Sequence, residues 1–337
     1  MNNSFLPNKI LLTGANGFIG SVVLKELVSR GFHVVAITRN PFKVNEYHGF
    51  VEFVTGNLCD ENAIEEAIKE CDCVIHCAGV VSFDSKKYTE INNIHVEIAR
   101  KIIRAGKKNC LKRFVYVSSH WVLGFSYAKD ILCSENTPLN PDGKCHNVYQ
   151  KSKFDGEQAV IEECGEEIDA VMANPTQVWG PENKNAMFNS YIKKLLTRRF
   201  FIVPSAGINI IDVKDAASGI VEVCLKGRKG NRYIIGGENI TYSQLLKIIF
   251  KARGFGGKII EIPTKPLQLF IRLMQKATIA LPEFVRDKLS FIETALSFRY
   301  YSSKKAEVEI GFFPKYLAEQ TVLNTVYYLG GHRCVIK

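Results

Sequence analysis

The chain of 337 residues lacks long apolar runs, paired cysteines and low-complexity segments. No run reaches the roughly 18 apolar residues of a membrane-spanning helix, and no signal peptide is recognisable at the N-terminus. The ten cysteines are scattered, since the closest pair, Cys71 and Cys73, is not a Cys-x-x-Cys, and His76 with Cys77 adds no second metal pair. We therefore expect free thiols, no disulfide framework, no metal site and a cytoplasmic location.

Acidic residues are too few to balance the basic ones, and the formal net charge is +10. The basic clusters, at residues 107–108, 193–194, 198–199 and 226–232, are short and are not interleaved with aromatic residues. Nucleic-acid binding surfaces combine basic residues with such aromatics. We therefore expect no nucleic-acid partner, and attribute the charge to solvated surface or to a polyanionic cofactor.

The rest of the chain is organised around a glycine-rich stretch at residues 9–20, KILLTGANGFIG. A short apolar run leads into Gly14, Gly17 and Gly20, and an amphipathic pattern follows. This order predicts a strand, a tight turn and a helix whose free N–H groups can hold a pyrophosphate. A glycine-rich turn without a ligand is the alternative, because a glycine fingerprint alone is a weak signal.

The next predicted strand, residues 32–38, ends without the acidic residue that commonly binds the ribose of NAD. Arg39 stands there instead, and Lys43 follows shortly after. A guanidinium suits the 2′-phosphate of NADP. The sequence thus favours NADP as cofactor, with NAD as the alternative if Arg39 is only a surface residue.

Strand and helix patterns alternate along most of the chain. Further strands are predicted at residues 51–54, 73–79, 114–119, 171–181 and 208–215, and the last of these leads to Asp215 as the expected cap of a helix that starts at Ala216. Beyond Arg232 helices are predicted at residues 242–253, 266–281, 283–295 and 316–328. This order predicts an α/β protein with a doubly wound parallel sheet and a smaller, mostly helical C-terminal lobe. We place the cofactor domain at residues 1–172, with 205–230 returning to it, and the substrate lobe at 173–337.

Tyr149 and Lys153 begin a helical pattern about 30 residues after Ser118 and Ser119. Their four-residue spacing puts both on one helix face, where an ammonium would lower the pKa of the phenol. Such a tyrosine can exchange a proton with a carbonyl or alcohol near neutral pH. The same spacing recurs at Tyr300 and Tyr301, but beside neither a glycine loop nor a serine strand, so we interpret those as packing or surface residues.

Together these motifs resemble the extended short-chain dehydrogenases/reductases, the NAD-dependent epimerase/dehydratase superfamily. The resemblance runs over almost the whole chain, through Thr13-Gly-x-x-Gly-x-x-Gly20, Gly56-Asn-Leu58, His76-Cys-Ala-Gly79, Ser118-Ser119, Tyr149-x-x-x-Lys153, Asn174-Pro175 and Gly180-Pro181. It implies a seven-stranded Rossmann sheet and hydride transfer between nicotinamide and a carbon bearing oxygen. It also implies three catalytic roles: Tyr149 as acid/base, Lys153 as its pKa partner and ribose ligand, and Ser119 as the hydroxyl that orients the substrate oxygen. Ser118 is the alternative to Ser119.

The resemblance also implies the residues that hold the cofactor. These are Gly14, Asn16, Gly17, Phe18, Ile19, Gly20, Arg39, Asn57, Leu58, His76, Ala78, Gly79, Ser118, Tyr149, Lys153, Asn174 and Pro175. Two positions depart from the family pattern. Asn57 replaces the usual acid beside the adenine, and the asparagine of the proton relay below the lysine is missing, which leaves His95, Asn92 and Asn93 as candidates.

Within the superfamily, sugar-nucleotide enzymes usually carry a phosphate-gripping arginine just before the strand that ends near Asp215. Residues 206–215, AGINIIDVKD, contain none. The chain looks most similar to the dihydroflavonol 4-reductase-like branch, with the 3β-hydroxysteroid dehydrogenase branch as its neighbour. We therefore expect a small or medium, largely apolar carbonyl or alcohol substrate, and no tight binding of uridine or guanosine diphosphate sugars.

Three alternatives stay open from the sequence. The first is a 3β-hydroxysteroid-type dehydrogenase or a sugar-nucleotide epimerase/dehydratase. The second is a cofactor-sensing regulatory protein, which the presence of all three catalytic residues disfavours. The third is membrane contact through residues 267–281, a helical pattern that is apolar on one face; packing within its own lobe is the more common use of such a helix. A homodimer is a further option.

Overall fold

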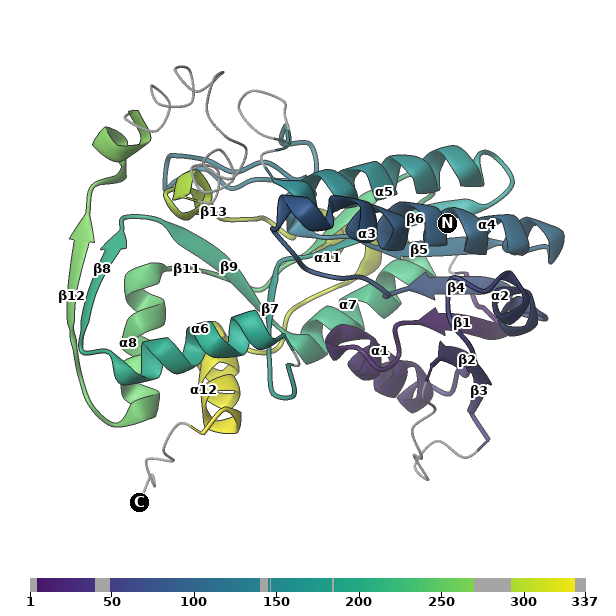
Figure 1. The fold of residues 1–337 in the computed structure, drawn as a ribbon, viewed down its shortest axis with the longest axis horizontal. Coiled ribbons are helices and arrows are strands. Elements are labelled where there is room, and N and C mark those ends of the chain that lie inside the picture. Colours follow the sequence, from purple (N-terminus) through teal and green to yellow (C-terminus); the bar gives the residue numbers. More distant parts are fainter. Residues whose placement is uncertain are drawn as a thin grey trace.

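The computed structural model describes residues 5–39, 49–139, 145, 147–183, 185–269 and 292–330. Its centre is a seven-stranded sheet in which every neighbouring pair is parallel (Figure 1). In spatial order the strands are β10 (Arg232–Ile235), β6 (Asp169–Pro175), β5 (Arg113–Val117), β4 (Cys73–His76), β1 (Lys9–Thr13), β2 (His33–Thr38) and β3 (Val51–Thr55).

Helices cover both faces of this sheet, so its strands are buried on both sides. One face is covered by α1 (Phe18–Ser29), α7 (Val213–Lys226) and α11 (Lys304–Ile310). The other is covered by α2 (Glu61–Ile68), α4 (Ile98–Lys108) and α5 (Val148–Cys164). Successive residues of β1 alternate between the two cores, with Ile10 and Leu12 in the first and Leu11 in the second. The predicted doubly wound parallel sheet is therefore confirmed.

The direction in which the chain adds strands reverses between β1 and β4. From β1 the chain adds β2 and β3 on one side, and then returns to add β4, β5, β6 and β10 on the other. In open α/β sheets, ligands bind in the crevice outside the carboxyl ends of the strands at such a reversal. The carboxyl ends of β1 and β4 are thus where a cofactor is expected.

The smaller lobe contains strands as well as helices (Figure 1). Its four-stranded sheet joins β7 (Gln177–Trp179), β9 (Gly207–Asp212), β11 (Glu238–Thr241) and β13 (Phe298–Arg299), and a two-stranded ribbon joins β8 (Phe200–Pro204) and β12 (Lys258–Ile262). Its helices in the described part of the chain include α6 (Ala186–Thr197), α8 (Tyr242–Arg253) and α12 (Ala318–Tyr328). The short strands pair across large sequence separations, which explains why local periodicity predicted mainly helices here.

The two parts exchange chain segments. After β9 in the small lobe, α7 and β10 return to the large sheet, and α11 packs near them much later in the chain. The return therefore includes residues beyond the expected segment 205–230. The domain boundary at residue 172 itself stays a prediction.

Several local predictions can be compared with the structure. The helix predicted at 242–253 is confirmed as α8, and that at 316–328 as α12, which begins at Ala318. Asp215 as a helix cap is wrong: α7 begins earlier, and Asp212 caps it by accepting a hydrogen bond from the Lys214 amide at 2.9 Å. Asp215 instead accepts from the amides of Lys315 and Tyr316, which ties α7 to the segment before α12.

Part of the C-terminal pattern cannot be compared. Most of the segment 267–281, with its proposed membrane face, and most of 283–295 lie outside the described residues. No helix in the described part of the chain is both long enough and apolar enough to cross a membrane. The nine cysteines of the described ranges are free thiols.

Candidate active site

The glycine-rich turn after β1 has the geometry that its sequence predicts. Gly14 has φ +74°, and a Cβ added there would lie 2.7 Å from the Ala78 amide nitrogen. A Cβ on Gly20 would lie 2.1 Å from the Gly14 carbonyl oxygen, so α1 packs against the turn itself. Gly17 caps α1 without a side-chain hydrogen bond, which leaves the amides of the first turn, where Phe18 and Ile19 lie, free for an anion.

The same turn is tied to the end of the next strand. Asn16 donates a hydrogen bond to the Thr38 hydroxyl at 2.5 Å. Arg39 follows directly and is exposed. Asn57, after β3, is also exposed, and its side-chain oxygen accepts from the Cys59 amide at 3.1 Å. The structure thus brings Asn16, Arg39 and Asn57 to the carboxyl edge of β1, β2 and β3, where the nucleotide half of a cofactor is expected.

His76 behaves differently from its neighbours at the end of β4. It is fully buried, its Nδ1 lies 2.8 Å from the Thr13 hydroxyl, and burial lowers its pKa to about 3. His76 thus links β1 and β4 beneath the surface, and its contact with a cofactor stays a prediction. Ala78 and Gly79, just beyond it, are accessible and remain candidates. The imidazole locks β4 to β1 directly beneath them.

Tyr149 and Lys153 lie on α5, one turn apart. Asn147 begins this helix by accepting a hydrogen bond from the Gln150 amide at 2.8 Å. α5 approaches the sheet closely, since a Cβ on Gly156 would lie 2.3 Å from the Tyr116 hydroxyl. Both functional side chains are buried at this contact. The expectation that they share one helix face is confirmed.

The electrostatics of this pair differ from the simple expectation. Burial raises the pKa of Tyr149 to about 12, and a hydrogen bond with Ser119 opposes this rise. Lys153 donates to the Val117 carbonyl at 2.9 Å, and burial lowers its pKa to about 8. Lys153 thus does not lower the pKa of the phenol in this arrangement, because its ammonium is directed at the end of β5.

A buried polar chain supports the end of β5, where Ser118 and Ser119 lie. Asn174 donates to the Ser119 carbonyl at 3.1 Å and to Glu157 at 2.8 Å, and Glu157 is paired with Arg232 at 2.5 Å. Asn174 is fully buried and bonds the backbone at Ser119; its contact with a cofactor stays a prediction. Glu157 was missed, although its place four residues after Lys153 on the same helix face was a usable signal.

The remaining members of the predicted set are less constrained. The Ser118 hydroxyl is buried and has no hydrogen-bond partner among the described residues. Pro175 is buried, and its carbonyl oxygen lies 3.2 Å from His120 Nδ1. Leu58 is partly buried against the core of the sheet. For Ser118, Pro175 and Leu58, contact with a cofactor stays a prediction.

The three candidates for a proton relay lie in a π-helical turn, Asn93–Glu97, and the residue before it. His95 is fully buried, whereas Asn92 is half-buried and Asn93 exposed. His95 Nε2 accepts from the Val80 amide at 3.2 Å, and its Nδ1 lies 2.9 Å from the Ser152 hydroxyl. Burial lowers its pKa to about 2, with the charge of Lys153 adding to the effect.

This bonding determines what His95 can do. Because Nε2 accepts a hydrogen bond, the ring proton lies on Nδ1 and is donated to Ser152, whose hydroxyl donates to the Tyr149 carbonyl at 2.9 Å. Both ring nitrogens are thus occupied by fixed partners. A neutral ring in this position acts as a clamp between α5 and the segment after β4, and not as a proton carrier. Of the three candidates, His95 is the one that contacts this network.

Aromatic rings surround the Tyr149 phenol. Phe83, His95 and Trp121 have ring centroids 5.7, 5.9 and 6.3 Å from that of Tyr149. Phe83 and Trp121 are half-buried and in contact with each other, with centroids 5.1 Å apart. Sequence reasoning missed both, because they lie in irregular segments. They give the space in front of the hydroxyl an apolar wall.

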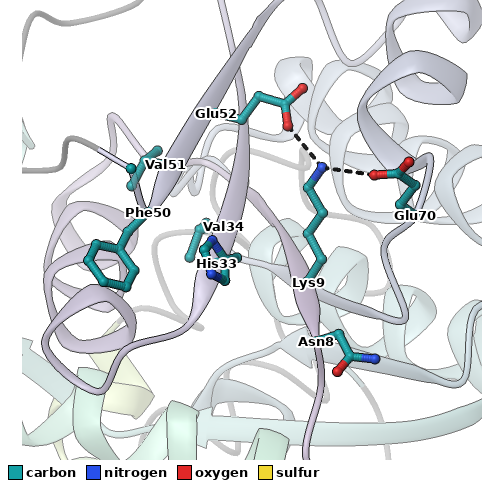
Figure 2. Close-up of a pocket in the computed structure, with 9 residues that line it drawn as sticks. Asn8, Lys9, His33, Val34, Phe50, Val51, Glu52 and Glu70 are labelled. Carbon is teal, nitrogen blue, oxygen red and sulfur yellow. Dashed lines mark hydrogen bonds and ion pairs between the residues drawn. The ribbon is translucent and has the colours of Figure 1, made fainter.

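A hollow lies at the amino-terminal edge of the sheet, among β1, β2 and β3, away from the glycine-rich turn (Figure 2). Figure 2 shows Lys9 between Glu52 and Glu70, and its ammonium lies 2.9 and 3.4 Å from their carboxylates. Lys9 is thus paired within the fold, and ligands of such sheets bind at the carboxyl edge. We therefore assign the active site to the carboxyl edge.

Many basic side chains form ion pairs with nearby carboxylates. On α4, Lys107 lies 2.7 Å from Glu167 and Lys108 2.7 Å from Glu65. Such pairs spread charge over the surface and do not form the basic stripe of a nucleic-acid site. Within the described ranges, no group of three or more potential ligand side chains could hold a metal ion.

Comparison with known proteins agrees with this geometry. Residues 10–236 match the model of the NAD dependent epimerase/dehydratase family. A putative dihydroflavonol 4-reductase from Synechocystis is 24% identical over 327 residues, covering 95% of this chain and 94% of that protein. A sterol-4-alpha-carboxylate 3-dehydrogenase (decarboxylating) from Dictyostelium discoideum is 27% identical over 256 residues, covering 73% and 76%.

A solved structure is also similar in fold. The dTDP-glucose 4,6-dehydratase DesIV from Streptomyces venezuelae, determined with NAD bound, has a TM-score of 0.73 and covers 95% of this chain and 96% of its own. At 17% sequence identity this likeness concerns the fold alone.

Proposed function

Since the chain belongs to the NAD dependent epimerase/dehydratase family, we propose that it is an NADP(H)-dependent oxidoreductase. It transfers a hydride between the nicotinamide and a carbonyl or alcohol carbon of a small, largely apolar substrate, with Tyr149 as acid/base. The observation that carries this proposal is the buried Tyr149 phenol on α5, which lies beside Phe83 and Trp121 and one helical turn from Lys153.

The roles of the chain's own groups follow from their positions. The glycine-rich turn after β1 would hold the cofactor, which would supply a hydride for the carbonyl carbon, while the Tyr149 hydroxyl would donate its proton to the carbonyl oxygen. Ser119 donates a hydrogen bond to the same oxygen and orients it. A proton leaves Tyr149 most readily when positive charge is near the phenolate. In the structure the Lys153 ammonium is directed at the Val117 carbonyl, so in this proposal the positive charge near the phenolate would be that of the oxidised nicotinamide.

Arg39 supports NADP as the preferred cofactor. It is exposed directly after β2, which is tied to the glycine-rich turn through Asn16 and Thr38. A 2′-phosphate on the ribose would lie at this edge of the sheet and would form a charge-assisted hydrogen bond with the guanidinium. NAD remains the alternative cofactor.

The sterol-4-alpha-carboxylate 3-dehydrogenase relative favours a second candidate, a 3-hydroxysteroid-type dehydrogenase. The apolar wall formed by Phe83 and Trp121 suits a fused-ring substrate as well as a smaller carbonyl compound. A substrate panel that contains small aldehydes, aryl ketones and 3-oxosteroids separates the two candidates.

The decisive experiment is Tyr149→Phe, assayed by NADPH consumption with the best substrate of that panel. The change removes only the phenolic hydroxyl, so fold and cofactor binding should survive. General acid catalysis contributes typically 10²–10⁴-fold, and we expect kcat to fall by about that factor.

Three further variants calibrate this result. Tyr300→Phe removes a buried hydroxyl with the same spacing to a lysine and should keep parental activity. Ser119→Ala should be milder than Tyr149→Phe, because it orients the oxygen without giving it a proton. Lys153→Met should also weaken cofactor binding. Near-parental kcat for Tyr149→Phe on a verified substrate would contradict the mechanism and favour a regulatory role.

A further inference from the structure

Arg299, on β13 of the smaller lobe, is a buried cation without a countercharge. Its side chain is 4% exposed. Nη2 donates a long hydrogen bond of 3.4 Å to the Thr294 hydroxyl, but Nε and Nη1 have no hydrogen-bond partner among the described residues. No carboxylate of those residues lies within ion-pair distance of it. Burying a charge and its N–H groups unpaired costs several kcal/mol, so this arrangement calls for an acceptor.

Two other arginines show how the same chain satisfies a buried guanidinium. Arg253 is equally buried and donates to several backbone carbonyls, including that of Leu195 at 2.9 Å. Arg113 is paired with Asp169. Each thus has its acceptors within the fold. Arg299 is about as buried as these two arginines, but two of its nitrogens have no acceptor among the described residues.

The unpaired guanidinium lies close to the proposed catalytic residues. It stacks on the Trp121 ring, with its central carbon 4.1 Å from the ring centroid. Trp121 in turn contacts Tyr149 edge-on. One indole therefore separates the cation from the acid/base. The charge of Arg299 also contributes to the lowered pKa of His120, the residue between Ser119 and Trp121.

Strand register adds a second observation. β13 runs parallel to β9, and Arg299 pairs with Ile208. Ile208 belongs to the segment 206–215, in which the sequence contains no arginine. A guanidinium is nevertheless present on the neighbouring strand.

We propose that Arg299 binds an anionic substituent of the substrate, a carboxylate or a phosphate. The inference rests on the proposed function, because it assigns this group to the molecule whose carbonyl Tyr149 protonates. Nε and Nη1 are shielded from water here, and the half-buried Trp121 indole covers the guanidinium, so the anion gains access when this ring shifts. A charge-assisted hydrogen bond in such a poorly hydrated site is a strong one. The substrate is then apolar around its carbonyl and anionic at one end.

The first experiment compares charged and uncharged aldehydes of nearly equal shape. The probes are 4-formylbenzoate, its methyl ester and 4-formylphenyl phosphate, each assayed with NADPH for kcat and KM. We expect the parent enzyme to prefer one of the two anions over the ester by roughly 10- to 100-fold in kcat/KM. The preferred anion identifies carboxylate or phosphate as the ligand.

Variants assign this preference to Arg299. Arg299→Gln should abolish it by raising KM for the anions while leaving the ester unchanged, and Arg299→Lys should keep part of it. Arg198→Gln is the matched control, because it removes an exposed positive charge from the same lobe. A parent enzyme without preference for either anion overturns the proposal, even if Arg299→Gln fails to fold.

A binding measurement separates this proposal from the proposed function. The chain has two tryptophans, and Trp179 is fully buried elsewhere. In a Trp179→Phe background, fluorescence therefore reports on Trp121, and benzoate or phenyl phosphate should change it in a saturable way that Arg299→Gln removes. Charge-dependent binding without reduction of any aldehyde would leave the anion site standing and refute the oxidoreductase assignment. If Arg299→Gln reduces aldehydes and still prefers the anions as the parent does, the oxidoreductase assignment stands and the anion site at Arg299 is refuted.

Discussion

Two buried sites, one in the large sheet and one in the smaller lobe, differ in how their polar groups are bonded. In the large sheet, Glu157 bonds both Asn174 and Arg232, and His95 has a partner on each ring nitrogen. In the smaller lobe, Arg299 has two nitrogens without a partner among the described residues. The Glu157 carboxylate thus has its countercharge within the sheet, although other buried atoms there, among them the Ser118 hydroxyl and His76 Nε2, have no partner within the described ranges. The lobe leaves a charge for something else to neutralise, as befits the part that selects a substrate.

The largest effect, a loss of stability in the large sheet, is expected for Gly14→Ala. A Cβ there meets backbone atoms of Cys77 and Ala78 at 2.8 and 2.7 Å, and the residue has φ +74°. Strain and overpacking together should cost about 2–5 kcal/mol of the free energy of unfolding. Cofactor affinity, followed by calorimetry, should fall with it.

Gly31→Ala is the matched control for that variant. Gly31 has φ +81°, but no atom lies within 4 Å of its added Cβ. It should therefore cost only the conformational part, about 1–2 kcal/mol. Equal destabilisation by the two variants in urea unfolding would show that close approach at the turn does not matter, and would remove the physical basis for a cofactor loop here.

The next effect concerns cofactor choice and again belongs to the sheet. Arg39→Ala should weaken NADPH binding by about 1.5–3 kcal/mol, the range for a hydrogen bond to a charged group, and should hardly change NADH binding. Arg198→Ala, an exposed arginine of the other lobe, should change neither. If calorimetry finds equal weakening of both cofactors, or tighter NADH binding in the parent, the assignment to NADP is wrong.

The smallest expected effect concerns the free energy of unfolding at acidic pH, to which three buried histidines contribute. Burial lowers the pKa of His76 and His120 to about 3 and that of His95 to about 2. The folded state keeps these rings neutral, whereas the unfolded chain takes up protons below about pH 6.5. Each ring therefore contributes stability that is fully present above pH 6.5 and is lost as the pH falls towards 3, by about 1.4 kcal/mol per pH unit.

A single variant tests this contribution. Between pH 7.5 and 5.5 the free energy of unfolding of His95→Gln should fall by about 1.4 kcal/mol less than that of the parent. His33→Gln, which changes an exposed ring at the amino end of β2, should leave the parental profile. A parental slope in His95→Gln would mean that the clamp is not held neutral as its hydrogen bonds indicate.

Local chemistry made much of the cofactor half predictable. Gly14, Gly17 and Gly20 specify one turn, since the backbone approaches itself too closely for any other residue. The spacing of Tyr149 and Lys153 specifies one helix face. In contrast, the sequence did not reveal that His76 and Asn174 are buried, because whether a side chain at a strand end faces the crevice or the core depends on its packing partners.

The sequence by itself determined the alternating strands and helices of the large sheet, the glycine-rich turn and the helix face that Tyr149 and Lys153 share, because each depends on residues that are neighbours along the chain. Tertiary structure alone decided what His95 bonds, which side chains support Ser119, and where Arg299 lies. Arg299 meets Trp121 and Ile208 only because β13 pairs with β9. Contacts between residues so far apart in sequence produce no local periodicity. That Arg299 is buried without a countercharge in the described part of the chain can therefore be recognised only in the tertiary structure.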